Sequence, residues 1–351
     1  MQTTHRIIFE NSKNMKELSS NSVNLIVTSP PYPMITMWDE MFSRQNQEIH
    51  KALNNQDGLL AFELMHKELD EVWNQSWRVL KKGSFACINI GDAARTLNGN
   101  FALYPNHSRI ISHMLGIGFT VLPEILWRKQ TNAPNKFMGS GMLPAGAYVT
   151  LEHEFILIFR KGEKREFKQP IEKKERRKSS YFWEERNTWF SDIWTDLKGR
   201  SQNLFDSTTR KRSAAFPFEL PYRLINMFSV KGDTVLDPFL GIGTTSYAAM
   251  AACRNSVGYE LESGFKDLIF SGTDTIVPYS NECITKRIDS HLNFIKQRSK
   301  ENKECRHVNQ NYNFQVITKQ EKDMILNRLI SVDKYNDLIE VHYSDGVTRN
   351  S

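Results

Sequence analysis

Two short stretches, far apart in the chain, carry the residue types best suited to chemistry. The first is TSPPYP at residues 28–33, which follows the apolar run at 23–27. Because proline fixes φ and donates no backbone hydrogen bond, a strand that ends at two prolines leaves its sheet as a stiff loop. Outward carbonyls and an aromatic ring on such a loop could accept hydrogen bonds from an amino group and stack on the planar ring that carries it. A proline-rich turn without chemistry is the alternative.

The second stretch is DPFLGIGTT at residues 237–245, where a predicted strand gives way to a helix. Glycines there let the backbone pass close to a ligand, and Asp237 can accept a hydrogen bond from a hydroxyl or ammonium group. The stretch lacks the lysine of a phosphate-binding loop, and Asp237 would repel an anion. Glu260 ends the next predicted strand, where acidic residues of nucleotide folds bind both ribose hydroxyls. Together these features favour a cationic nucleoside such as S-adenosylmethionine over NAD or ATP.

Length and composition are those of a soluble globular protein. The chain has 351 residues, of which 40% are hydrophobic and 25% charged. We find no apolar run near the ~18 residues of a membrane span and no signal-peptide core. The four cysteines form neither a CxxC pair nor a Cys/His cluster with zinc spacing, so we expect reduced thiols, no metal site and a cytoplasmic protein. A net charge of +6 is compatible with a polyanionic partner.

Strand, helix and strand patterns alternate along the chain. Continuous apolar runs predict buried strands, and apolar residues at helical spacing predict helices. The expected strands cover 6–9, 23–27, 84–90, 119–127, 154–160, 234–237 and 256–260, and the expected helices cover 11–18, 59–80, 104–115, 218–228 and the residues after 243. We expect a polar surface insertion at 43–58 and one or two helices within 319–342. The alternation indicates an α/β protein with a mostly parallel, doubly wound sheet.

Residues 163–212 are richer in basic and aromatic groups than the rest of the chain. Between residues 161 and 178, nine Lys or Arg stand against four Glu, and a run of aromatic residues follows. Basic groups beside aromatic rings suit phosphate contacts with stacking side chains, and a solvated charged face is the alternative. The candidate DNA-binding residues are Lys173, Lys174, Arg176, Arg177, Lys178, Arg210, Lys211 and Arg212.

The two stretches together resemble the amino-methylating DNA methyltransferases of the β arrangement, in which the catalytic half precedes the cofactor half. The resemblance extends over residues 6–265, and further similar blocks lie at 14–32, 77–92, 152–162, 214–225 and 258–260. It implies a Rossmann-like fold of the S-adenosylmethionine-dependent methyltransferase type. The implied parts are a catalytic half (1–162), a target-recognition region (163–212), a cofactor half (213–265) and a C-terminal extension of unknown role (266–351).

The resemblance also implies the activity and its residues. A methyl group would pass from S-adenosylmethionine to an exocyclic amine of a base flipped out of double-stranded DNA. The implied catalytic residues are Ser29, Pro30, Pro31 and Tyr32. The implied cofactor-binding residues are Asn11, Thr28, Asp237, Pro238, Phe239, Gly241, Gly243, Thr244 and Glu260. The implied setting is a restriction–modification system, with a monomeric or homodimeric enzyme and a cognate endonuclease that acts on the same site without a stable complex.

Two positions depart from the family pattern. Glu10-Asn11-Ser12 stands where members often carry Gly-Asp-Ser, so the cofactor contact of that Asp would fall to Asn11. Ser29 stands where many members carry Asp or Asn, and serine there is associated with N4-cytosine methylation, whereas Asp is associated with N6-adenine. The preferred hypothesis is therefore an N4-cytosine DNA methyltransferase. The alternatives are an N6-adenine enzyme, a protein-glutamine or RNA methyltransferase, and a catalytically silent DNA-binding protein.

Overall fold

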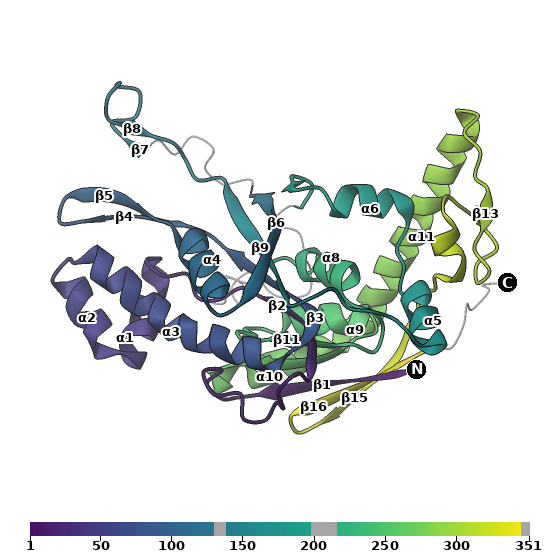
Figure 1. The fold of residues 1–351 in the computed structure, drawn as a ribbon, viewed down its shortest axis with the longest axis horizontal. Coiled ribbons are helices and arrows are strands. Elements are labelled where there is room, and N and C mark those ends of the chain that lie inside the picture. Colours follow the sequence, from purple (N-terminus) through teal and green to yellow (C-terminus); the bar gives the residue numbers. More distant parts are fainter. Residues whose placement is uncertain (130–137, 198–215, 345–351) are drawn as a thin grey trace.

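A ten-stranded sheet forms the centre of the molecule (Figure 1). The structure is a computed structural model that describes residues 1–129, 138–197 and 216–344. In spatial order the strands are β10 (Ile193–Trp194), β6 (Phe119–Arg128), β9 (His153–Lys161), β3 (Leu80–Ile90), β2 (Val23–Thr28), β11 (Thr234–Asp237), β12 (Asn255–Tyr259), β1 (Gln2–Ile8), β16 (Leu338–Tyr343) and β15 (Leu329–Tyr335).

The centre of this sheet is parallel and its flanks are mixed. Neighbours among the five central strands, from β3 through β2, β11 and β12 to β1, all pair in parallel. On one side β9 pairs antiparallel with both β3 and β6, and on the other β16 pairs antiparallel with both β1 and β15. The predicted α/β class with a mostly parallel sheet is confirmed.

Helices cover both faces of the sheet. Successive side chains on a strand point to opposite faces. Accordingly Ile26 of β2 packs in one hydrophobic cluster with Trp73, whereas Leu25 and Val27 pack in another with Leu224. The helices that bury these two faces are α3 (Gly58–Val79) and α4 (Asn106–Gly116) on the first, and α8 (Glu219–Phe228), α9 (Thr244–Ala251) and α11 (Ile276–Lys300) on the second. The sheet is therefore doubly wound, as predicted.

Shorter elements fill the connections. Within the described residues, the remaining α-helices are α1 (Asp39–Gln45), α2 (Gln47–Asn54), α5 (Pro170–Lys178), α6 (Trp183–Trp189) and α10 (Lys266–Gly272). The 3-10 helices there are η1 (Thr36–Trp38), η2 (Ser263–Phe265), η3 (Thr273–Thr275) and η4 (Lys319–Asp323). Three small antiparallel pairs are β4 (Ala93–Leu97) with β5 (Asn100–Tyr104), β7 (Met138–Gly139) with β8 (Ala147–Tyr148), and β13 (His307–Val308) with β14 (Gln315–Val316). Among the described helices, none has the length and apolar character that crossing a membrane requires.

Three stretches fold differently from the sequence predictions. The predicted short helix at 11–18 is a series of turns. The stretch at 43–58, predicted to be a polar surface insertion, carries α2, which buries Ile49 and Ala52. Of the one or two helices predicted within 319–342, the 3-10 helix η4 is present at the start, but the rest of the prediction is wrong, because β15 and β16 form a hairpin there. Alternate residues of β16 are buried, in the period-two pattern of a half-buried strand.

Parallel pairing explains how the two chemically promising stretches meet. Val235 and Leu236 of β11 pair with Leu25 and Ile26 of β2. Because both strands run in the same direction, the proline loop after β2 and the glycine-rich turn after β11 emerge side by side at the carboxyl edge of the sheet.

The proline loop is also tied down from outside the sheet by Asn106, the fully buried first residue of α4. Its Nδ2 donates to the carbonyls of Pro33, 3.1 Å away, and of Gly91, 2.9 Å away. Burial lowers the pKa of His66 to about 3, so the neutral ring donates from Nε2 to Asn106 Oδ1 at 2.9 Å.

Replacing Asn106 by Ala should therefore leave two buried carbonyls and a ring N–H without partners. We expect the free energy of unfolding to fall by about 1–3 kcal/mol in chemical denaturation. Asn54→Ala, which removes an exposed helical asparagine from α2, is the matched control. Equal stability of the two variants would contradict the anchoring role of Asn106.

Candidate active site

A cavity of about 850 Å³ lies at the carboxyl edge of the central strands. The proline loop contributes Ser29, Pro30, Pro31 and Tyr32 to its wall, and the second stretch contributes Pro238, Phe239 and Gly241, joined by Asn11 and Glu260. The structure thus brings residues from both stretches into one cavity. Four other predicted cofactor-binding residues, Thr28, Asp237, Gly243 and Thr244, are not in this wall and lie in or beside the turn behind it.

Asp237 joins the two halves of the site from behind. Its Oδ1 accepts hydrogen bonds from Thr28 Oγ1 at 2.6 Å and from the Phe239 N–H at 3.0 Å, and its Oδ2 accepts one from Thr245 Oγ1 at 2.6 Å. The residue is only 2% exposed, and burial raises its pKa to about 6. This carboxylate links β2, β11 and α9. Its predicted cofactor contact, like that of Thr28, stays a prediction.

The glycine-rich turn needs its glycines for conformation. Gly241 has a φ of 56° and Gly243 a φ of 90°, backbone conformations that residues other than glycine rarely adopt. A Cβ on Gly243 would also lie 3.2 Å from the Ile269 side chain and 3.3 Å from that of Tyr247. Thr244 then begins α9 as a buried residue. The backbone conformation of the turn therefore requires both glycines, the packing behind the turn also requires Gly243, and Gly241 presents its backbone to the cavity.

Glu260, which follows β12, brings a carboxylate to the cavity wall. Its Oε2 accepts from the Gly241 N–H at 2.7 Å and its Oε1 from the Glu262 N–H at 2.8 Å. Burial raises the pKa of Glu260 to about 7. Each oxygen keeps a further lone pair, so the fixed carboxylate can accept hydrogen bonds from a pair of hydroxyls. Phe239 and Phe265 are also in the wall, so this part of the cavity offers a nucleoside both a hydrogen-bond acceptor for its hydroxyls and aromatic rings for its base.

Tyr32 is held by a network that sequence reasoning missed. Its hydroxyl donates to Glu154 Oε2 at 3.0 Å and accepts from Ser29 Oγ at 3.1 Å and Asn89 Nδ2 at 2.8 Å. Asn89 also donates to Glu154 Oε2 at 2.7 Å, and Lys129 forms an ion pair with Glu154. Burial and the neighbouring Glu154 raise the pKa of Tyr32 well above its usual range, so the phenol stays neutral.

Close packing completes the support of the tyrosine ring. A Cβ on Gly91 would lie 3.0 Å from Tyr32 Cε2 and 3.3 Å from Glu154 Cγ, so glycine is the residue that leaves room for the ring. In the sequence, the one indication of this network is the pair of acidic residues, Glu152 and Glu154, at the start of an otherwise apolar strand.

Among the residues that the structure describes, no group of His, Cys, Asp and Glu is placed to hold a metal ion.

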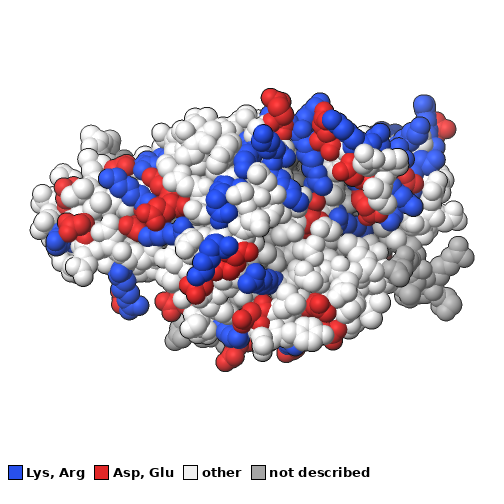
Figure 2. Space-filling view, turned by 60° about the horizontal axis from the view of Figure 1, so that its bottom comes forward, with Lys and Arg blue, Asp and Glu red and all other residues white. Residues whose placement is uncertain are grey.

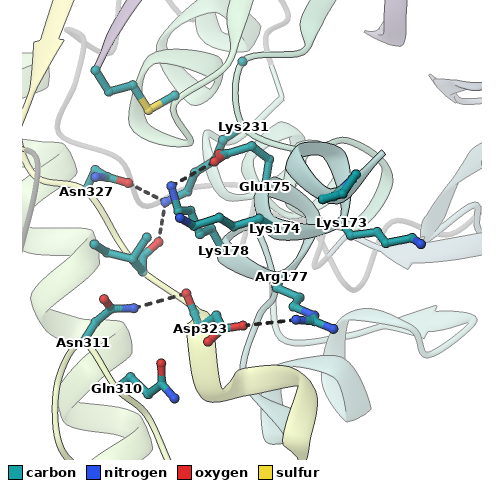
Figure 3. Close-up of a pocket in the computed structure, with 14 residues that line it drawn as sticks. Lys173, Lys174, Glu175, Arg177, Lys178, Lys231, Gln310, Asn311, Asp323 and Asn327 are labelled. Atoms are coloured by element: carbon teal, nitrogen blue, oxygen red, sulfur yellow. Dashed lines mark hydrogen bonds and ion pairs between the residues drawn. The ribbon is translucent and has the colours of Figure 1, made fainter. Parts of the chain in front are cut away.

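The predicted DNA-binding residues lie elsewhere. Figure 2 shows Lys and Arg side chains gathered, with acidic ones among them, at the end of the molecule that carries α5 and α11. A second cavity, of about 910 Å³, has Lys173, Lys174, Arg177 and Lys178 of α5 in its wall (Figure 3). Arg176 lies instead over the Phe167 ring, 4.7 Å from its centroid. Arg210, Lys211 and Arg212 fall outside the described residues.

This basic cavity lies at the opposite edge of the sheet from the first. Met1, before β1, and Gly232, before β11, line it, whereas Asn11 and Pro238, which follow those strands, line the first cavity. The seven residues of β1 alone span roughly 23 Å at ~3.3 Å per residue. Several of the charges are already paired there: Lys178 with Glu175 at 2.9 Å and Arg177 with Asp323 at 3.8 Å. DNA contact by α5 stays a prediction.

Comparisons with known proteins place this chain among DNA methylases. A family model described as DNA methylase matches residues 23–271. The chain is 55% identical over 327 residues to the type II methyltransferase M.MthZI of Methanothermobacter thermautotrophicus, covering 93% of this chain and 91% of that protein. It is 50% identical over 280 residues to the type II methyltransferase M.MjaI of Methanocaldococcus jannaschii, covering 76% and 90%.

A solved structure supports the same assignment. The putative DNA modification methylase TTHA0409 from Thermus thermophilus, in complex with S-adenosyl-L-methionine, superposes with a TM-score of 0.60 at 30% identity, covering 78% of this chain and 96% of that one. The resemblance seen in the two sequence stretches is confirmed, and the Rossmann-like methyltransferase fold with it. The chain belongs to the N6/N4 DNA methylase family.

Proposed function

We propose that this DNA methyltransferase transfers a methyl group from S-adenosyl-L-methionine to the N4 amine of a cytosine flipped out of double-stranded DNA. The observation that carries the proposal is the single cavity in which Ser29 and Tyr32 of the proline loop share a wall with Phe239 and Glu260. Because related proteins are named type II methyltransferases, we also propose the setting of a restriction–modification system, with a cognate endonuclease as partner.

The second half of the cavity suits the cofactor. When bound, S-adenosyl-L-methionine supplies an electrophilic methyl group on a sulfonium centre. Glu260 would accept hydrogen bonds from the ribose hydroxyls of the cofactor. The Phe239 ring and the Gly241 backbone line the same part of the cavity and would contact the rest of the nucleoside. Asn11 lines the cavity in place of the family's aspartate, and Asp237, Thr28 and Thr245 brace the turn from behind.

The first half of the cavity suits an amine. Carboxylate oxygens only accept, so the Tyr32 hydroxyl must donate to Glu154, and Ser29 must then donate to Tyr32. With its only hydrogen committed, Ser29 Oγ can meet a substrate only as an acceptor. The amino group of a base offers two N–H donors, which Ser29 Oγ and the Pro30 carbonyl would accept.

Positioning the amine in this way addresses its poor nucleophilicity. The nitrogen lone pair of an aromatic amine is delocalised into the ring, and two directional acceptors turn it out of that conjugation toward the cofactor side of the cavity. The Tyr32 ring would stack on the base, and its π face would stabilise positive charge that develops on the nitrogen. Ser29 in place of an acidic residue supports cytosine as the base.

Expressing the gene in a host without such modification tests the proposal directly. We expect base-modification sequencing to find one short methylated sequence, and mass detection of digested nucleosides to find N4-methylcytosine. Tyr32→Ala, which keeps the cofactor half intact, should bind cofactor and leave the DNA unmodified. N6-methyladenine without N4-methylcytosine would contradict the cytosine assignment, and unmodified DNA from the wild-type enzyme would contradict the proposed activity.

Cofactor affinity should depend on the ionisation of Glu260. Below its pKa of about 7 the free protein carries a protonated Glu260, which has lost acceptor capacity for ribose hydroxyls. Affinity should therefore rise with pH up to about pH 7, by at most about tenfold per pH unit, and level off above it.

A calorimetric titration of cofactor across this pH range measures the effect. Glu260→Gln is the matched control, because it is isosteric, cannot ionise and leaves the titration of the cofactor itself unchanged. We expect the ratio of the two affinities to change through about pH 7, following the ionisation of Glu260. A constant ratio across the range would show that this carboxylate does not contact the cofactor.

A further inference from the structure

The β7–β8 hairpin rises from the rim of the active-site cavity. It is inserted between the ends of β6 and β9, and the Lys129 N–H donates to the Glu152 carbonyl at 2.7 Å to close that antiparallel ladder. Lys129 and Glu154, on either side of the insertion, both line the cavity. Figure 1 shows the hairpin projecting beyond the sheet, on the same side as the β4–β5 hairpin.

The described part of this insertion has an apolar, uncharged tip. Residues 138–151 contain no Asp, Glu, Lys, Arg or His. Met142 is 86% exposed, Leu143 69% and Val149 87%. Large apolar side chains exposed to solvent on one short segment are typical of an interaction site.

The β7–β8 hairpin packs against the β4–β5 hairpin. Tyr148 of β8 stacks on Phe101 of β5, with ring centroids 4.5 Å apart and planes 12° apart. The β4–β5 hairpin is in turn fastened by Arg95, whose guanidinium donates to both oxygens of Asp39 at 2.8 and 2.7 Å. Asp39 begins α1, and residues 40–42 of that helix line the active-site cavity.

The turn of the hairpin is itself compact. Ser140 Oγ donates to the Leu143 carbonyl at 2.6 Å, and the Ser140 N–H donates to the Gly146 carbonyl at 2.9 Å. A Cβ on Gly139, which has φ of 67°, would lie 2.1 Å from that Gly146 carbonyl oxygen. The turn therefore has a defined shape, and the stacking of Tyr148 on Phe101 joins the hairpin to the β4–β5 hairpin.

We propose that the β7–β8 hairpin is a wedge that enters the DNA stack at the target base and fills the space which the flipped base leaves. The inference rests on the proposed function. Apolar side chains inserted between base steps separate those steps, and a tip without charge can enter the stack without burying an unpaired ion. DNA is the fitting occupant because the chain segments on either side of the hairpin contribute Lys129 and Glu154 to the cavity that must receive the base.

The wedge role is tested by removing the apolar tip and comparing methylation of a target base that is paired with one that is already unstacked. The probes are two duplexes with the target sequence found by modification sequencing: one fully paired, and one with an abasic site opposite the target base, which is already unstacked. In single-turnover methylation, Met142→Ser/Leu143→Ser should be at least about tenfold slower than wild type on the paired duplex, since flipping costs a few kcal/mol. It should match wild type on the abasic duplex.

Control variants separate the wedge from general effects. Ile330→Ser removes an apolar side chain that is 62% exposed on β15, remote from the cavity, and should leave both rates unchanged. Leu143→Phe keeps an apolar tip and should keep the rate on the paired duplex. Thermal melting and cofactor titration verify that each variant folds.

Three results would overturn the proposal. The first is an equal loss of rate by the double variant on both duplexes, and the second is no loss on either. The third is dissociation of a dimer by the double variant in sedimentation, which would assign the tip to a second copy of the chain. If the wild-type enzyme methylates neither duplex, the proposed function fails and the wedge with it.

Discussion

Hydrogen bonds to the buried carboxylate of Asp237 hold the two halves of the site in register. An isolated carboxylate in the core would cost several kcal/mol, and the hydroxyls of Thr28 and Thr245 with the Phe239 N–H replace the lost water. Burial nevertheless raises the pKa of Asp237 to about 6, so desolvation outweighs these bonds. A neighbouring strand that shifted its register would leave this charge without its partners. The alignment of β2 with β11 is therefore coupled to the solvation of one carboxyl group.

Further hydrogen bonds hold the proline loop from residues outside β2 and β11. Asn106 holds the carbonyls of Pro33 and Gly91, and Glu154 and Asn89 hold the Tyr32 hydroxyl. The loop thus has few alternative conformations when a base arrives. Direct transfer between two bound groups gains most of its rate from positioning, so a rigid acceptor pair is what this chemistry needs from a protein. The polar network sets the direction of each hydrogen bond as well as its place.

Sequence patterns predicted the parts of the site that depend on local chemistry. The apolar runs located the central strands, and the family resemblance carried by the two stretches implied that they form one site. Glu154 could not be found this way, because its place beside Tyr32 depends on the antiparallel register of β9 with β3. The basic residues of α5 were visible in composition, but the edge of the sheet on which they lie was not. The β15–β16 hairpin was missed because its partner, β1, is distant in sequence.

The most direct measurement of the central claim is the single-turnover methylation rate of Thr28→Val at saturating cofactor. This change removes one hydroxyl from Asp237 and keeps the side-chain shape. The matched control is Thr273→Val, which removes a buried hydroxyl that donates to the Phe270 carbonyl at 2.7 Å, away from both stretches. The account predicts that both variants lose about 1–3 kcal/mol of stability and that only Thr28→Val loses rate. Equal rates in the two variants would contradict it.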